Sequence, residues 1–167
     1  MTEFSDESPT HTTQPSTSLG VFRAPGVGER LDISGIGHLF RLTAEDTAGR
    51  FAVEEFTVPR NATGVPPHIH DAHDEYFYIL DGRLTLWAGD AEVVADVGAV
   101  VAAPRGVPHG YRNNTERPAT ALCLYTPAGY ENYFREVHAA IARGEDISED
   151  KLAQFRAKYA TRPYPEC

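Results

Sequence analysis

The stretch His68-Ile-His70-Asp-Ala-His73-Asp-Glu75-Tyr-Phe-Tyr-Ile-Leu-Asp-Gly82 combines potential metal ligands with a strand pattern. Side chains alternate across a strand, so the pattern predicts that His68 and His70 project from one face. The polar residues that follow can turn the chain so that Glu75 faces the same centre. The apolar run after Glu75 ends at Asp-Gly, a favoured turn dipeptide, and therefore predicts a hairpin.

A second stretch, about thirty residues later, supplies a fourth potential ligand. Residues 98–113 read Gly-Ala-Val-Val-Ala-Ala-Pro-Arg-Gly-Val-Pro-His-Gly-Tyr-Arg-Asn, in which proline and glycine mark a turn and His109 begins the second strand-like run. Imidazole nitrogen suits Zn, Cu, Fe and Ni, and a carboxylate oxygen extends the set towards Mn and Co. The residues therefore predict a metal site of three histidines and one glutamate.

Together the two stretches resemble the two motifs of the cupin family, G-x5-H-x-H-x3,4-E-x6-G and G-x5-P-x-G-x2-H-x3-N. The matching positions are His68, His70, Glu75 and Gly82 in the first motif and Gly98, Pro104, Gly106, His109 and Asn113 in the second. One position departs from the motif, because three residues and not five separate Gly64 from His68. That departure concerns the turn that enters the strand and none of the ligands.

The resemblance to cupins implies an all-β fold, the double-stranded β-helix or cupin jelly roll, followed here by short C-terminal helices. It also implies that His68, His70, Glu75 and His109 hold one divalent transition metal, namely Ni, Co, Mn or Fe, with Zn also possible. Four protein ligands leave one or two positions open on such an ion, which is the arrangement of a catalytic site.

Within the cupins, the sequence looks like the small single-domain bacterial quercetin 2,3-dioxygenase-like proteins over about residues 35–160. The likeness rests on Pro-Pro-His-Ile-His at 66–70, the block 74–82, Thr-Pro-Ala-Gly at 126–129 with the aromatic segment after it, and the late segment 151–159. It implies a metal-dependent dioxygenase that opens an aromatic or heterocyclic enol, such as a flavonol, with O2. It further implies that Glu75 takes the hydroxyl proton of the substrate.

The metal motif leaves two other functions open. It is shared with decarboxylases, isomerases, polyketide cyclases and non-catalytic cupins, so it specifies fold and site better than substrate. One alternative is a non-redox metal cupin, a cyclase or isomerase of secondary metabolism. The other is a cupin that binds a small molecule without converting it. Oxygen consumption separates the dioxygenase from the non-redox enzyme, and any turnover separates both enzymes from a binding protein.

Strand alternation also identifies candidate pocket residues. Phe77 and Ile79 share a face with Glu75, and Tyr111 shares one with His109. Phe77, Ile79 and Tyr111 are therefore predicted to line an aromatic-walled substrate pocket.

Four other histidines match no ligand position of the motifs, and one of them, His11, lies in the N-terminal segment and is expected to be solvated. His38 lies in an early strand-like run and is interpreted as structural. His73 lies between the first two ligands and Glu75 and is interpreted as a rim residue, and His138 is expected on a helix surface.

The chain divides into three parts by composition. Residues 1–18, rich in Ser, Thr, Pro and acidic side chains, predict a disordered arm. Residues 19–130 carry short apolar runs between turn signals and predict the cupin β-domain. Residues 131–167 change to a helical period, with Gly144 where one helix stops and Ser148 where the next begins. This last part is predicted to be a helical extension packed on the β-domain.

Composition and charge limit the partners. The formal net charge of -9 argues against a nucleic-acid partner and against an anionic membrane surface. The sequence contains no run of eighteen apolar residues, so it predicts no membrane span. Two cysteines predict a reducing compartment, and without a secretory signal pattern the expected location is cytoplasmic. The expected partners are an aromatic small molecule and O2, and exposed strand edges predict a homodimer.

Overall fold

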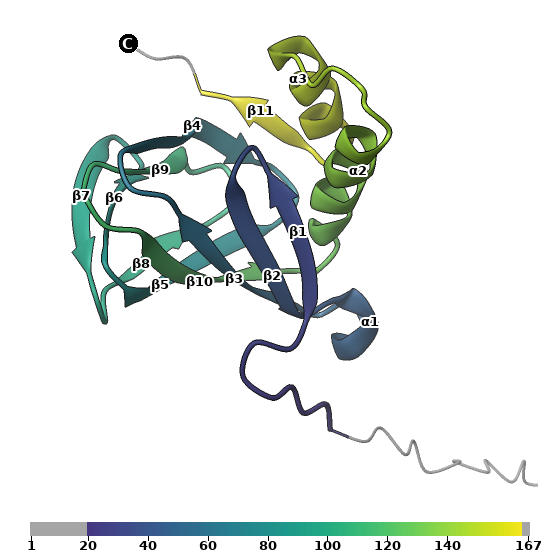
Figure 1. Ribbon diagram of the computed structural model, residues 1–167, viewed down its shortest axis with the longest axis horizontal. Coiled ribbons are helices and arrows are strands. Elements are labelled where there is room, and N and C mark those ends of the chain that lie inside the picture. The colour runs from purple at the N-terminus through teal and green to yellow at the C-terminus, as the bar shows by residue number, and fades with distance from the viewer. Residues whose placement is uncertain (1–19, 165–167) are drawn as a thin grey trace, which may run out of the picture.

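The computed structural model describes residues 20–164 and contains two antiparallel sheets (Figure 1). The six-stranded sheet has the order β1 (Glu29–Ile33), β2 (Ile36–Leu42), β3 (Ala52–Val58), β10 (Ala119–Thr126), β5 (Asp74–Asp81) and β8 (Val100–Ala103). The five-stranded sheet has the order β11 (Thr161–Pro163), β4 (Ala62–His70), β9 (His109–Asn113), β6 (Arg83–Ala88) and β7 (Ala91–Asp96). Successive strands β3 to β6 alternate between the sheets, and the predicted all-β double-stranded β-helix is confirmed.

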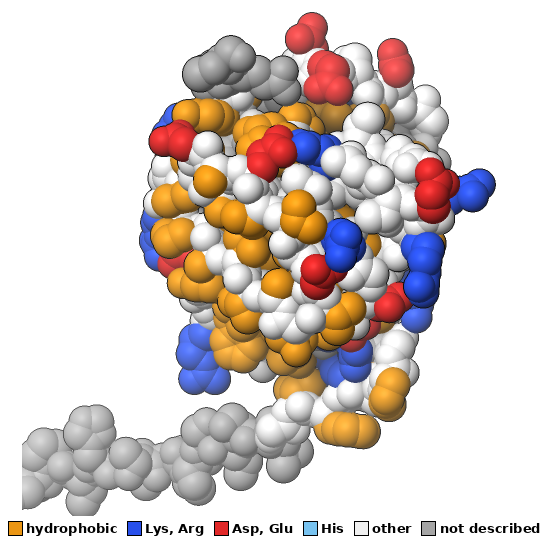
Figure 2. All heavy atoms as spheres, turned by 90° about the vertical axis from the view of Figure 1, so that its left-hand side faces the viewer, with side chains coloured by type: hydrophobic (Ala, Val, Ile, Leu, Met, Phe, Trp, Pro, Cys, Tyr) orange, Lys and Arg blue, Asp and Glu red, His pale blue; other side chains and the backbone are white. Residues whose placement is uncertain are grey.

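The core lies between the sheets because apolar residues alternate along the strands. In β10 every second side chain, from Ala119 to Tyr125, is buried. In β5 the side chains of Phe77 and Ile79 are buried while that of Tyr78 is exposed. Such alternation gives a sheet one buried and one wet face. Figure 2, which views the side of β6, β7 and β8, shows the resulting outer surface, where apolar side chains are spread among charged ones.

Gly64 and Gly82 occupy positions where a side chain has no room. Gly82 has a φ of 73°, and a Cβ there would lie 2.7 Å from the Pro118 carbonyl oxygen. It joins β5 to β6, so the predicted turn is present, but the predicted hairpin is wrong, because the two strands lie in different sheets and do not pair. Gly64 has a φ of 68°, and a Cβ there would lie 1.9 Å from the Tyr111 carbonyl oxygen on β9. The glycine that departs from the motif spacing therefore lies inside β4, where the backbone of β9 comes close.

Three helices occur in the described chain: α1 (Ala44–Thr47), α2 (Glu131–Ala142) and α3 (Glu149–Lys158). As predicted, α2 ends just before Gly144, whose φ is 75°, and α3 begins after Ser148. The Ser148 hydroxyl accepts a hydrogen bond from the backbone N–H of Lys151 at 3.3 Å. Figure 1 shows α2 and α3 together at one side of the sheets. The single turn α1 is too short for a helical period to appear in the sequence.

The C-terminal region also contributes a strand that the sequence did not predict. Residues 161–163 form β11, which pairs with β4 so that Thr161 lies opposite His70. The tail was expected only to be extended. Its pairing adds residues far along the chain to the sheet that carries three of the predicted ligands.

The described residues do not test two of the sequence-based expectations. The predicted disordered arm, residues 1–18, lies outside the described residues. The boundaries of the β-domain and its extension stay predictions. Within residues 20–164, no helix has the length and apolar character needed to cross a membrane.

Candidate metal centre

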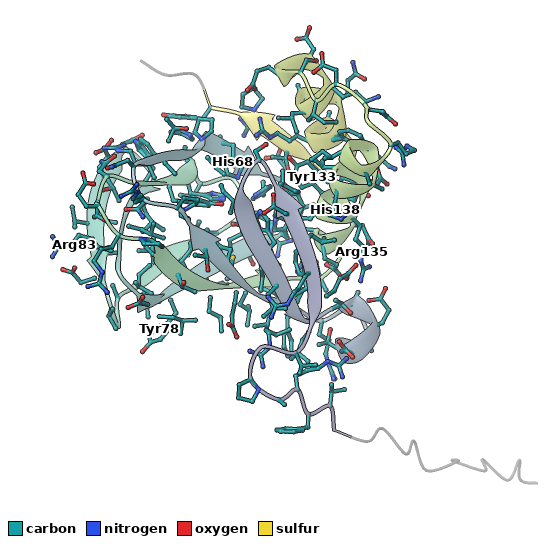
Figure 3. The ribbon with its side chains drawn as sticks, in the orientation of Figure 1. His68, Tyr78, Arg83, Tyr133, Arg135 and His138 are labelled. Carbon is teal, nitrogen blue, oxygen red and sulfur yellow. The ribbon has the colours of Figure 1, made fainter. Side chains whose placement is uncertain are left out.

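The four predicted ligands converge from three strands of the two sheets. His68 and His70 come from β4, His109 comes from β9, and Glu75 comes from β5 in the other sheet. The pairing register places His68 directly opposite His109. In Figure 3, His68 lies in the upper part of the β-domain, on the side towards the helices. The residues therefore meet between the sheets, beneath the C-terminal extension.

The ligand atoms lie close enough together to share one ion. Nε2 of His68 is 3.1 Å from Nε2 of His70, which is 2.9 Å from Oε1 of Glu75. Nε2 of His109 is 3.5 Å from Oε2 of Glu75. His70, His109 and Glu75 are buried, and His68 is partly exposed. The structure thus brings the four side chains into two overlapping groups that share His70, namely His68, His70 and His109, and His70, His73 and Glu75.

Each of the three histidines uses its other ring nitrogen to hold the ring in place. Nδ1 of His68 and of His109 each donates to the carbonyl two residues earlier in the chain, at 3.0 and 2.9 Å. Nδ1 of His70 donates to the hydroxyl of Thr161 at 2.7 Å. These bonds place the proton on Nδ1 and leave each Nε2 as an acceptor that faces the centre.

The donor set fits a bound cation. Nε2 of His109 is fully buried and has no hydrogen-bond partner in the described part of the chain. Such an atom costs about 1–3 kcal/mol when it is left unsatisfied, and a metal ion would remove that cost. Three imidazole nitrogens and one carboxylate oxygen suit a divalent transition metal and do not choose between Ni, Co, Mn, Fe and Zn.

Burial and neighbouring charges set the protonation of the centre. Burial, followed by the neighbouring His109 and His70, lowers the pKa of His68 from 6.5 to about 3. Burial alone would raise the pKa of Glu75, but His70, His109 and His73 outweigh it and hold that pKa well below its ordinary value. Burial lowers the pKa of His109 too, yet the Glu75 carboxylate raises it by more.

A fifth polar side chain, His73, belongs to the same cluster. It is buried, with 4% of its surface exposed, and its Nε2 lies 3.2 Å from Oε1 of Glu75. This location corrects the interpretation of His73 as a rim residue. Its ring centroid lies 4.1 Å from that of His70. The signal that was missed is the alternation, because His73 precedes Glu75 by two residues and so shares its face.

A partly enclosed cavity of about 250 Å³ adjoins the centre. Tyr130 lines it, and the Tyr130 ring centroid lies 4.5 Å from that of His70, so the cavity and the centre share a wall. Tyr111 also lines the cavity. Phe77 and Ile79 instead lie in the hydrophobic core and are not among the lining residues. Assignment of these three residues to a substrate pocket stays a prediction.

Comparison with known proteins agrees with the motifs. Residues 54–125 match the family model of the cupin domain, Cupin_2. The chain is 27% identical over 124 residues to quercetin 2,3-dioxygenase of Bacillus subtilis, covering 74% of this chain and 36% of that protein. It is 30% identical over 102 residues to quercetin 2,3-dioxygenase of Aspergillus japonicus, covering 57% of this chain and 29% of that protein. The chain therefore spans about a third of the length of these curated relatives.

Solved structures share the fold. KdgF from Halomonas sp. superimposes with a TM-score of 0.60 at 18% identity, covering 68% of this chain and 99% of that one. The polyketide cyclase RemF from Streptomyces resistomycificus gives a TM-score of 0.59 at 18% identity, covering 84% and 94%. With this fold, these motifs and this match, residues 54–125 of the chain form a cupin domain. Within the cupins, the sequence of the chain resembles the quercetin 2,3-dioxygenases.

Proposed function

We propose that the protein is a metal-dependent dioxygenase that opens a flavonol-like aromatic or heterocyclic enol with O2. The proposal is carried by the convergence of His68, His70, Glu75 and His109 beside a partly enclosed cavity with aromatic walls. A divalent metal bound there would supply Lewis-acid polarisation of the enol oxygen and access to O2 chemistry. In the overall reaction the substrate is oxidised, both atoms of O2 enter the ring-opened product, and one carbon leaves as carbon monoxide.

Glu75 is the proposed base. As the hydroxyl O–H bond of the substrate breaks, a new O–H bond forms on the Glu75 carboxylate. The neighbouring His70 and His109 help to keep the pKa of Glu75 well below its ordinary value, so the carboxylate is ionised and able to accept a proton. The rings of Tyr111 and Tyr130 would orient a planar substrate and exclude water from this transfer.

The test is metal analysis of untagged wild-type protein, His70→Ala and His138→Ala, followed by oxygen-electrode assays with flavonols. Each protein is first reconstituted with Ni, Co, Mn, Fe or Zn. We expect about one metal per chain in the wild type, loss of metal in His70→Ala, and O2 uptake only in metal-loaded protein. His138→Ala is the matched control, because that histidine lies on α2 and bonds to the backbone of Asp32.

The other outcomes contradict the proposal in different ways. Stoichiometric metal without O2 uptake favours a non-redox cyclase or isomerase, in which Lewis-acid polarisation is sufficient. Absence of metal under every reconstitution favours a cupin that binds a small molecule.

We also propose that the protein forms a homodimer through the outer face of the six-stranded sheet. Tyr76, Tyr78 and Val100 are exposed on adjacent strands of that face, and Figure 3 shows Tyr78 pointing away from the β-domain. In sedimentation experiments the wild type should be a dimer and Tyr78→Lys a monomer. Val94→Lys, on β7 of the other sheet, should leave the dimer intact. A monomeric wild type would contradict the proposal. A cytoplasmic location rests on the cysteine count and stays a prediction.

A further inference from the structure

A second polar cluster lies inside the β-domain, apart from the metal centre. It consists of His38 on β2, Glu54 on β3 and Tyr125 on β10, all of them buried. One carboxylate oxygen of Glu54 accepts from Nδ1 of His38, and the other accepts from the hydroxyl of Tyr125. Burial of an ionised carboxylate is costly without such partners. The two bonds therefore hold Glu54 between its neighbours and fix the ring of His38.

The second ring nitrogen of His38 is available to a ligand. In the tautomer that donates from Nδ1 to the carboxylate, Nε2 carries no proton and is an acceptor. Among residues 20–164, no group forms a hydrogen bond with this Nε2, and it is not one of the fully enclosed unpaired atoms. His38 lines the 250 Å³ cavity that adjoins the metal centre.

Aromatic rings connect His38 to the metal centre along this cavity. The ring centroid of Phe134 lies 4.7 Å from that of His38 and 5.5 Å from that of Tyr130. Tyr130 in turn lies 4.5 Å from His70 by the same measure. His38, Phe134 and Tyr130 all line the cavity, as does Tyr111. A flat molecule of linked rings would therefore lie against aromatic walls, with one end at the centre and the other at His38.

We propose that His38 determines specificity by accepting a hydrogen bond from a ligand hydroxyl that is remote from the metal-bound end. Glu54 is the positioning residue, because it holds the His38 proton on Nδ1 and so leaves Nε2 of His38 free to accept. The preferred ligands are then planar aromatic molecules with a second hydroxyl in addition to the enol. This inference rests on the proposed function for the class of ligand, the flavonols.

The test compares two flavonols that differ in their remote hydroxyls. Quercetin carries hydroxyls on both of its ring systems, whereas 3-hydroxyflavone carries only the enol hydroxyl. Calorimetric titration should show that metal-loaded wild-type protein binds quercetin about tenfold more tightly, as one buried hydrogen bond allows. His38→Gln retains an N–H donor for Glu54 but loses the ring nitrogen. It should bind both flavonols equally.

Two further variants make the result specific. His138→Gln, outside the cavity that adjoins the centre, should keep the preference for quercetin. Glu54→Gln should reduce the preference, and it serves as the test if His38→Gln does not fold. A preference that survives in the folded cavity variants, or a wild type with no preference, overturns the inference.

Oxygen uptake with 3-hydroxyflavone tests the proposed function separately, because that ligand offers His38 no remote hydroxyl. Uptake without a quercetin preference overturns the role of His38 and keeps the dioxygenase. A preference that depends on His38, without uptake of O2 on either flavonol, keeps the inference and contradicts the dioxygenase. Failure of both flavonols to bind overturns the inference as well.

Discussion

Nδ1 of His70 lies 2.7 Å from the hydroxyl oxygen of Thr161, although 91 residues separate them in the sequence. The contact exists because β11 pairs with β4 and places Thr161 opposite His70. The Thr161 hydroxyl donates onward to the carbonyl of Tyr159 at 3.3 Å. Groups that orient a ligating histidine in this way usually change metal affinity by roughly 10- to 100-fold. The last described strand is therefore part of the support of the metal centre.

Replacement of Thr161 tests this support. In Thr161→Val the acceptor for His70 Nδ1 is lost while the shape of the side chain is retained, so metal affinity should fall by about tenfold or more. Competition with a chelator of known affinity measures the change. Thr161→Ser keeps the hydroxyl and should bind metal like the wild type. Equal affinities for the valine and serine variants would show that the hydrogen bond does not support the centre.

Glu75→Gln tests the base. The amide cannot accept the substrate proton as a carboxylate does, so turnover of a flavonol should fall by at least about 100-fold. Metal should remain bound through His68, His70 and His109. Oxygen uptake and metal content are measured on the same samples. Glu92→Gln, on the surface strand β7, is the control and should retain full turnover. Intact metal with unchanged turnover in Glu75→Gln would exclude the proposed role.

Gly64→Ala tests the close approach of β4 and β9. The new Cβ would lie 1.9 Å from the Tyr111 carbonyl oxygen at a φ of 68°, so the free energy of unfolding should fall by about 3 kcal/mol or more. Gly89 has a similar φ of 66° with nothing within 4 Å of its Cβ position. Gly89→Ala should therefore cost only about 1–2 kcal/mol. Urea unfolding compares the two variants, and equal losses would mean that strain in φ alone accounts for both.

The metal-free protein should lose stability as the pH falls from 6.5 towards 3. Native His68 has a pKa of about 3 against an ordinary 6.5, because burial and the neighbouring histidines disfavour its charged form. Between these pH values the unfolded chain binds a proton that the native chain does not. This group therefore removes at most about 1.4 kcal/mol of unfolding free energy per pH unit.

Urea unfolding at pH 7 and at pH 5 measures this dependence. His68→Gln has no titrating ring at this position and should show a smaller loss between the two pH values. Because His70 and His109 titrate in both proteins, the difference between them isolates His68. Identical losses of unfolding free energy in the variant and the wild type would contradict the lowered pKa of His68.

Local features of the fold were predictable from the sequence. The turn at Gly82, the end of α2 before Gly144 and the cap of α3 at Ser148 each depend on residues within a few positions. The spacing of His68, His70 and Glu75 likewise follows from alternation along one stretch of chain. Since such rules act over short distances, the sequence is sufficient to locate these elements and the candidate ligands.

Features that depend on pairing between distant segments were not predictable. Nothing near His70 in the sequence indicates that its ring bonds to Thr161. Nothing near His38 indicates that its ring bonds to the Glu54 carboxylate. Alternation assigns Phe77 and Tyr111 to inward faces, but it does not tell which part of the interior is filled. The structure places both residues in the core, and only Tyr111 also lines the cavity, because the packing of the whole barrel decides which core residues border it.

The pairing of β11 with β4 also means that the site is completed late in protein synthesis. All four candidate ligands have been made once His109 is added, but Thr161 follows about fifty residues later. At ordinary translation rates this interval lasts roughly 3–10 s. During that time a nascent chain presents the ligands without the contact that orients His70. We therefore expect a chain that lacks Thr161 to hold a metal ion less tightly than the folded protein does.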